Sequence, residues 1–289
     1  FVLFIIVLMN LDISNPQKLI STLALFAAAA FRLFPSVSRI LLALQNIKYS
    51  QASTDFVSDQ IKNIVSHKPL INKSDFETLR FKQVNFNFKN KKIFEKTEFQ
   101  INKNDKIFLS GPSGSGKTTL INLILGFLKP SEGQIIVNNN TINSSKIYTR
   151  VSYVPQNIYL LDESIKKNIT FFDDGTNNEE KIQNLIESCM LSEFVKNLEK
   201  GIETNIGENA ALISGGQKQR IGIARALYKK NDILILDEAT NAIDLETEKL
   251  ILENILKLNK TVIFVSHKSN LKNLFQKRYK IFENKIIQD

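Results

Sequence analysis

Cysteine and histidine are scarce in this sequence, and their scarcity excludes two kinds of structure. Cys189 is the one cysteine among 289 residues, so no disulfide can form within the chain. The two histidines, His67 and His267, lack the spacing of metal ligands, and one cysteine cannot supply the paired cysteines of a zinc site. The sequence therefore predicts neither a disulfide scaffold nor a zinc-binding domain.

The sequence also lacks a basic tail and a stripe of alternating basic and aromatic residues. The formal net charge is +9, but lysines are scattered along the whole chain, with only short clusters such as residues 89–92. This distribution indicates an ordinary solvated surface. We therefore expect no nucleic acid among the partners.

Apolar residues are concentrated near the start of the chain. Residues 1–9 begin inside an apolar run with no basic segment before it, which is unlike a signal peptide. We expect them to be the end of a transmembrane helix whose upstream part is missing. Residues 19–31, with their neighbours, would cross much of a bilayer, and Arg32 and Arg39 would reach toward a cytoplasmic surface. A buried hairpin of soluble helices is the alternative reading of these residues.

The chain then changes character twice. Residues 44–64 keep a helical pattern but become polar, which predicts one long helix that leaves the membrane and continues into the cytoplasm. Residues 67–74 are typical of a linker. We therefore predict two domains: residues 1–70 as the C-terminal part of an α-helical transmembrane domain with a cytoplasmic extension, and residues 75–289 as a separate domain.

The second domain has the patterns of an α/β fold. Residues 81–88 alternate apolar and polar side chains, which predicts a strand. Residues 94–101 are expected to pair with another strand. Residues 233–237 and 261–266 are short, continuous apolar runs, typical of central parallel strands covered on both faces. Helices alternate with these strands, and residues 157–213 are mostly helical, so an α/β domain with a helical insertion is predicted.

A glycine-rich loop supplies the chemistry of this domain. Residues 111–119 read Gly-Pro-Ser-Gly-Ser-Gly-Lys-Thr-Thr and fit the phosphate-binding pattern G-x-x-x-x-G-K-[S/T]. The glycines let successive backbone N–H groups face a phosphate, while Lys117 and Thr118 reach the phosphates and Mg²⁺. A predicted strand precedes the loop and a predicted helix follows it, so the helix N-terminus would face the anion. A turn that binds nothing has no reason to place Lys-Thr between a strand and a helix.

Two further motifs complement this loop. Asp237 and Glu238 end an apolar strand, where Asp237 would help to hold Mg²⁺ through its water shell and Glu238 would polarise an attacking water. Ser214, Gly215 and Gly216 precede an apolar and basic helix, which makes a second helix start favourable to an anion.

In this order the motifs resemble those of the ATP-binding-cassette (ABC) family, with residues 212–220 as its signature. The resemblance covers roughly residues 79–289 and implies an α/β P-loop NTPase fold with an antiparallel β subdomain and a helical subdomain. It implies ATP and Mg²⁺ as cofactors, catalysis by Glu238, His267 and Gln156, and Mg²⁺ contacts from Thr118, Gln156 and Asp237. It assigns nucleotide contacts to Phe88, Gly111, Ser113, Gly114, Ser115, Gly116, Lys117, Thr118, Thr119, Ser214, Gly215, Gly216, Gln217, Asp237 and Asp244.

Phe88 and Asp244 lie outside the phosphate loop, the acidic strand end and the signature. Phe88 matches the aromatic that stacks on adenine, but as a strand residue it fits a core position equally well. Asp244 matches a loop that couples two ATP sites. Ile213 replaces the usual leucine and Asn241-Ala-Ile-Asp244 replaces Ser-Ala-Leu-Asp, and neither change removes a polar group that would touch nucleotide.

The resemblance also implies partners and a location. In this family the signature of one subunit faces the phosphate loop of another, so a single copy of each motif implies a second half-transporter subunit, identical or paralogous. Helices fused ahead of the ATPase are the exporter arrangement. We therefore expect a multi-pass protein of the inner or plasma membrane with its ATPase domain in the cytoplasm, membrane lipid around it, and a substrate that is exported or flipped.

Residues 26–40 and 153–165 look similar to the subgroup that flips lipid-linked oligosaccharides. The alternative function is a soluble ABC-type ATPase of DNA repair or chromosome maintenance. That class needs a long coiled coil between the phosphate loop and the signature, whereas here about a hundred residues without sustained heptads separate them.

Overall fold

The computed structural model describes residues 16–65, 76–88, 91–138, 140–141, 147–171, 173 and 179–289. The chain divides into two compact units, Phe1–Lys68 and Pro69–Asp289. The predictions for residues 1–9 and for the linker at residues 67–74 lie outside the described residues.

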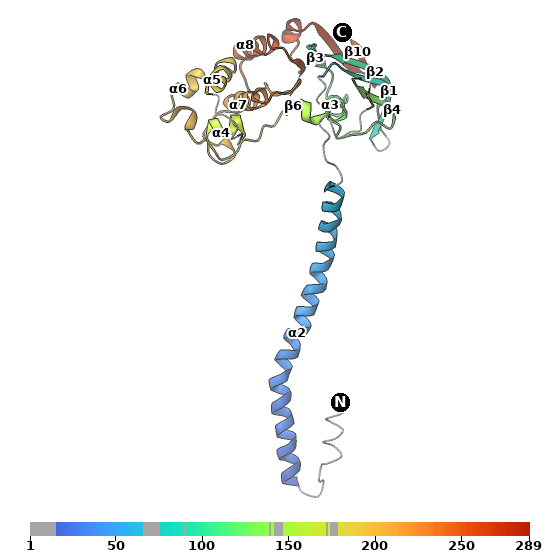
Figure 1. Ribbon diagram of the computed structural model, residues 1–289, viewed down its shortest axis with the longest axis vertical. Coiled ribbons are helices and arrows are strands. Elements are labelled where there is room, and N and C mark those ends of the chain that lie inside the picture. Colours follow the sequence, from blue (N-terminus) through green and yellow to red (C-terminus); the bar gives the residue numbers. More distant parts are fainter. Residues whose placement is uncertain are drawn as a thin grey trace. The chain divides into compact units, whose positions relative to one another are not determined.

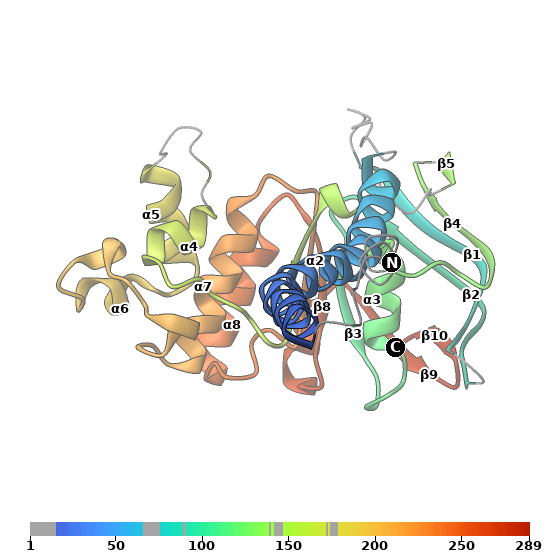
Figure 2. The same ribbon diagram turned by 90° about the horizontal axis from the view of Figure 1, so that it is seen from below.

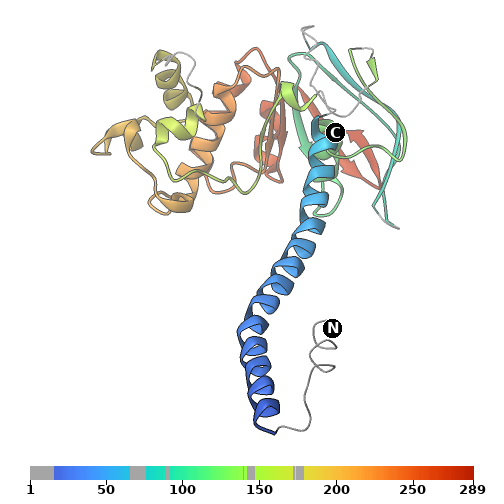
Figure 3. The same ribbon diagram turned by 60° about the horizontal axis from the view of Figure 1, so that its bottom comes forward.

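The first unit contains a single long helix in its described part, α2 (Pro16–Val65, 50 residues), which is drawn in blue (Figures 1 and 3). Pro16 opens the helix, where a missing N–H costs nothing because it would have no helical partner. Pro35 lies inside α2 without ending it. At 1.5 Å per residue the helix is about 75 Å long, well beyond the ~30 Å of a bilayer core. The prediction that the apolar segment and its polar extension form one helix is confirmed.

Most of the described apolar side chains of α2 are exposed. Phe31, Phe34 and Leu25 expose 87%, 74% and 71% of their surface. The stretch Ile20–Asp59 is long and apolar enough to cross a membrane, judged by length and composition alone. Large apolar side chains exposed in such number usually mark contact with lipid or another protein.

The second unit is built on a mainly parallel sheet in the order β10-β9-β3-β8-β7-β6. Its strands are β3 (Lys106–Ser110), β6 (Val151–Val154), β7 (Ile233–Asp237), β8 (Thr261–Val265), β9 (Lys277–Phe282) and β10 (Lys285–Gln288). Every residue of β7 and β8 is buried, as predicted for central strands. Because β3, β8, β7 and β6 run in the same direction, the loops after them meet at one edge of the sheet.

An antiparallel sheet, β2-β1-β4-β5, forms a second layer. Its strands are β1 (Thr78–Phe88), β2 (Lys91–Asn102), β4 (Glu132–Val137) and β5 (Asn140–Thr141). Helix α3 (Lys117–Leu125) lies between this sheet and β3 (Figure 2), and its apolar residues share one buried cluster with both. The predicted pairing is confirmed, and β2 is longer than expected because its pairing with β1 extends to Lys91.

A helical part lies on the side of the central sheet away from β1 and β2 (Figure 1). It contains α4 (Ile165–Thr170), α5 (Glu179–Ser188), α6 (Ser192–Lys196), α7 (Gly215–Tyr228) and the short 3₁₀ turns Gly201–Glu203 and Glu208–Ala210. These elements, with α8 (Leu245–Leu256) and the 3₁₀ turn η4 (Ser269–Leu274), share a second buried cluster with the central strands. The predicted α/β domain, its antiparallel and helical subdomains and the helix that precedes it are all confirmed.

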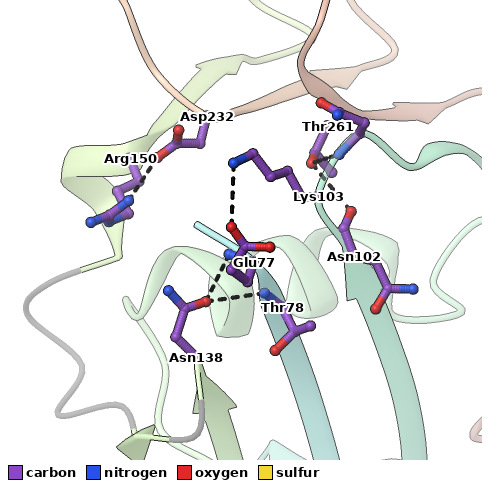
Figure 4. Close-up of polar contacts among 9 residues, drawn as sticks. Glu77, Thr78, Asn102, Lys103, Asn138, Arg150, Asp232 and Thr261 are labelled. Atoms are coloured by element: carbon purple, nitrogen blue, oxygen red, sulfur yellow. Dashed lines mark hydrogen bonds and ion pairs between the residues drawn. The ribbon is translucent and has the colours of Figure 1, made fainter. Parts of the chain in front are cut away.

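Polar contacts fasten the start of this unit at the edge opposite the glycine-rich loop (Figure 4). The Asn138 carbonyl oxygen Oδ1 accepts hydrogen bonds from the backbone N–H groups of Glu77 (2.8 Å) and Thr78 (3.0 Å). Arg150 Nη1 lies 2.9 Å from Asp232 Oδ2, which joins the chain before β6 to the chain before β7. Polar side chains thus connect the chain segments at this edge, whereas the glycine-rich loop follows the carboxyl end of β3 at the opposite edge.

Candidate nucleotide-binding site

The glycine-rich loop connects β3 to α3 as predicted. Gly116, at the N-cap of α3, has φ 106°, in the left-handed region that favours glycine. A Cβ at this position would lie 2.7 Å from Ile93 Cγ2, so packing as well as backbone angle requires glycine there. Gly114 also has a positive φ of 74°. The chain can therefore turn its N–H groups into the loop before the helix begins.

Lys117 is held inside this loop. Its side chain is 8% exposed, and its Nζ donates to the carbonyl oxygens of Gly111 (2.9 Å) and Pro112 (3.0 Å). Burial lowers the pKa of Lys117, while the nearby carboxylates of Glu238 and Asp237 act in the opposite direction. The two direct partners of Lys117 are neutral carbonyl groups, so an anion in contact with its ammonium group would be favoured.

The loop forms one wall of a cleft of about 380 Å³. The cleft is lined by Ile93, Ser113, Gly114, Gly116, Lys117, Thr118, Thr119, Gln156, Asp237, Glu238 and His267. It therefore brings together side chains from the loops after β3, β6, β7 and β8, which are far apart in the sequence.

Asp237, at the end of β7, is a buried acid. It is 8% exposed, and Tyr153 donates a hydrogen bond from its hydroxyl to Asp237 Oδ2 at 3.2 Å. Burial raises the pKa of Asp237, and the charge of Glu238 adds to this, whereas the Tyr153 bond and Lys117 lower it. A divalent cation would relieve the cost of the buried charge, so the donor set fits Mg²⁺.

Glu238 and His267, two of the predicted catalytic residues, are in direct contact. His267 Nε2 lies 2.9 Å from Glu238 Oε1, and Asn241 Nδ2 donates to Glu238 Oε2 at 3.2 Å. Glu238 has φ 51°, unusual for a non-glycine residue, and its N–H donates to the carbonyl of Val265 at 3.0 Å. Each carboxylate oxygen of Glu238 thus has one side-chain partner, from the loop after β7 or the loop after β8.

Phe88 and Ile93 belong to the same β1–β2 hairpin but differ in their relation to the cleft. Phe88 is 60% exposed and does not line the cleft, so the predicted core role is excluded and the adenine-stacking role stays a prediction. Ile93 lines the cleft and was missed. Alternation of apolar and polar residues cannot predict that Ile93 lines the cleft, because this depends on how the hairpin packs against Gly116.

The signature residues form a well-capped helix start outside this cleft. Ser214 Oγ accepts from the N–H of Gln217 (3.2 Å), and Gln217 Oε1 accepts from the N–H of Ser214 (2.8 Å), which is a capping box for α7. A Cβ on Gly216 would lie 2.9 Å from the carbonyl oxygen of Ala242. The cleft is lined by no residue from 214 to 217. The N-termini of α3 and α7, both predicted to favour an anion, therefore do not line the same cleft.

Asp244 also acts locally as a helix cap. Its Oδ1 accepts from the N–H of Thr247 at 2.9 Å at the start of α8, and this bond is the main cause of its lowered pKa. Its predicted role in coupling two ATP sites stays a prediction.

Residues 94–241, just over half of the chain, match the family model described as "ABC transporter". The chain belongs to the ABC transporter family.

Two relatives are similar to this chain over a longer stretch than the family model. An ATP-dependent lipid A-core flippase of Bordetella avium is 33% identical over 255 residues, which cover 85% of this chain and 43% of the flippase. A lactococcin-A transport/processing ATP-binding protein of Lactococcus lactis is 33% identical over 68% of this chain and 28% of its own length. The chain thus spans less than half of each of these relatives.

A solved structure supports the assignment. The structure of a bacterial Atm1-family ABC exporter with ATP bound has a TM-score of 0.70 and 26% sequence identity, and covers 77% of this chain and 40% of the exporter chain. The second unit is therefore an ABC ATPase domain, and α2 precedes it. By their printed names these relatives are a flippase, a transport/processing protein and an exporter.

Proposed function

We propose that this chain hydrolyses ATP as one half of an ABC exporter or flippase. The observation that carries the proposal is the single cleft in which Lys117, Gln156, Asp237, Glu238 and His267 meet. Those side chains supply the charges that phosphoryl transfer to water requires: a cation and N–H donors for phosphate oxygens, an acid for the metal, and an acid for the water.

The loop would hold the phosphates, with Lys117 and the N–H groups of Gly114 and residues 116–119 facing their oxygens. Thr118, Gln156 and Asp237 would hold Mg²⁺, which supplies positive charge to the phosphates when bound. Phe88 would stack on adenine from the exposed end of β1. Ser115 Oγ is buried without a hydrogen-bond partner among the described residues, which suits a loop that closes around a polar ligand.

Glu238 would orient the attacking water and accept its proton, as a general base does. His267, 2.9 Å from Glu238, would contact the γ-phosphate and keep this carboxylate pointed into the cleft. Gln156 follows β6 and would report the state of the site to the membrane part. These three residues are the proposed catalytic groups.

The site would be completed by a second copy of the chain or a paralogue. Residues 214–217 do not line the cleft, yet they form the N-terminus of α7, and the N-terminus of a helix favours an anion. Placed against the partner's phosphate loop, Ser214 and Gly216 would close the ATP site from outside and exclude water. Asp244, three residues from Asn241, would connect the two sites.

Helix α2 would connect this ATPase to the membrane. Its exposed apolar stretch fits lipid, so we place the protein in the inner or plasma membrane as part of a multi-pass transporter, with the second unit in the cytoplasm. The substrate we propose is a lipid-linked oligosaccharide, on the likeness of residues 26–40 and 153–165 to that subgroup. One relative is named as a lipid A-core flippase, which is in line with a lipid substrate.

Complementation between two inactive variants tests the proposed composite site. Lys117→Ala removes the phosphate-loop half, and Ser214→Arg blocks the signature half. Mixing the two full chains in detergent should restore Mg²⁺-dependent phosphate release, because a mixed dimer contains one site with both halves intact.

Lys117→Ala mixed with Glu238→Gln is the matched control and should stay inactive, since both changes damage the same half. Full activity of either single variant, or no complementation from a parent chain that is active, would contradict the composite site.

A further inference from the structure

An ion pair with a buried carboxylate involves the residue that follows His267. The side chain of Glu248, on α8, is 0% exposed, and its Oε2 lies 2.6 Å from Lys268 Nζ. Lys268 is the residue after His267, so one end of this pair is in the loop that carries the histidine. The other end is on the helix that follows the acidic end of β7.

Lys268 also holds the backbone between these two elements. Its Nζ lies 3.4 Å from the carbonyl oxygen of Thr240, two residues after Glu238, and Ile243 N–H donates to the same carbonyl at 3.1 Å. The Lys268 N–H in turn donates to Ser266 Oγ at 3.1 Å. One ammonium group therefore ties the loop after β8 to the loop after β7.

Stability alone does not account for this pair. Burying a carboxylate is costly, and apolar residues of similar volume usually serve a core at least as well. Glu248 Oε1 has no hydrogen-bond partner among the described residues, so even the desolvation of this carboxylate is only partly compensated.

We propose that Glu248 and Lys268 are positioning residues that hold His267 against Glu238. The direction of the Lys268 side chain toward α8 fixes the backbone at residue 268, and this leaves the preceding side chain, His267, facing the cleft. The inference rests on the proposed ATPase function and adds two residues that do not line the cleft to the groups that shape it.

Steady-state kinetics of the full chain in detergent test the proposal. Lys268→Met should lower kcat for ATP about tenfold and leave KM within about twofold, because the phosphate loop is untouched. Lys268→Arg, which keeps the charge, should recover most of kcat. Lys272→Met is the matched control: it removes an ion pair to Asp289 (2.5 Å) from η4, away from the acidic strand end, and should keep the parent kcat.

Lys268→Met leaves a buried carboxylate without its cation and could fail to fold. The variant Glu248→Gln with Lys268→Met removes both charges and keeps the shape, and it should fold while showing the same loss of kcat. A folded double variant with the parent kcat would overturn the proposal.

A double-mutant cycle separates positioning from a general structural role. If Lys268 acts through His267, Lys268→Met should cost little further activity in a His267→Ala background. Additive losses would overturn the proposal.

Histidine NMR gives a readout that does not depend on hydrolysis. The chain has two histidines, so ¹⁵N-histidine labelling of a His67→Gln chain leaves His267 as its one imidazole signal. This signal should move in the Lys268→Met with Glu248→Gln chain and return in Lys268→Arg. An unmoved signal would contradict the inference. Absence of ATPase activity in the parent chain would instead contradict the proposed function, with the NMR result still deciding on positioning.

Discussion

Burial governs the charged residues at the cleft. Lys117 and Asp237 are each 8% exposed, and the loss of water lowers the pKa of the ammonium group and raises the pKa of the carboxyl group. In such surroundings an incoming charge interacts more strongly than it would in water. The cleft is therefore suited to a highly charged ligand such as a nucleotide phosphate with its cation.

Glu238→Gln should slow ATP hydrolysis by roughly 100-fold or more, because a general base contributes about 10²–10⁴-fold. Nucleotide binding should persist, since the amide has the same shape, and ATP should then trap a dimer visible by size-exclusion chromatography with light scattering. Glu246→Gln, at an exposed position of α8, is the control and should keep the parent rate. Parent-like hydrolysis by Glu238→Gln would show that another group activates the water.

Lys117→Ala should weaken the binding of a fluorescent ATP analogue by roughly tenfold to a hundredfold. The estimate follows from the ~1.5–3 kcal/mol of a hydrogen bond to a charged group. Lys129→Ala removes an exposed lysine shortly after the same helix and should leave the Kd unchanged. Equal affinities for the parent and Lys117→Ala would remove the loop from the binding site.

Among the elements, the start of α7 and the segment before α8 depend on each other. The N–H of Ala242 donates to Gln219 Oε1 at 2.8 Å, and the backbone of Gly216 lies close to the carbonyl of Ala242. The signature helix is thus packed on the segment that connects Glu238 to Asp244. A displacement of the α7 N-terminus should therefore also displace the segment between Glu238 and Asp244.

Gly216→Ala should destabilise the protein by about 1–3 kcal/mol, the usual cost of overpacking, because its Cβ would meet a backbone oxygen at 2.9 Å. Gly215→Ala, one residue earlier, would meet only the Ala242 methyl at 3.3 Å and should be close to neutral, since alanine also favours the helix. Thermal unfolding of both full-chain variants decides between them. Equal melting temperatures would mean that the contact at residue 242 relaxes freely.

For the whole molecule, the two units differ in the surface that they expose. The second unit buries its apolar residues in two clusters, whereas α2 exposes phenylalanine and leucine side chains. Apolar burial is the main favourable contribution to folding in water, so the second unit contains its own core and α2 does not.

Residues 76–289 should therefore be soluble without detergent, while the full chain should require detergent or lipid. A chain of residues 45–289, which keeps the polar half of α2, is the control and should also be soluble. Sedimentation of membranes and of clarified lysate measures this directly. A full chain that stays monodisperse without detergent would show that residues 16–44 have another partner than lipid.

The local parts of the site were predictable from the sequence. The strand, loop and helix around residues 111–119 follow from glycine placement and an apolar run, and the cap at Ser214 follows from a short pattern ending in Gln217. The hydrogen bonds involved join residues close together in the chain, so local sequence determines them. The family resemblance added Gln156 and His267, which line the cleft as expected.

Only the tertiary structure decided which of these groups touch. The order β3-β8-β7-β6 places the ends of parallel strands side by side, and this brings Glu238 to His267 and Glu248 to Lys268 across long stretches of sequence. Ile93 reaches the cleft and Phe88 stays exposed for the same reason, because hairpin packing sets both. The sequence determined the chemical groups of this protein through local periodicity and motifs, whereas their distances depend on long-range strand order and packing that no local pattern records.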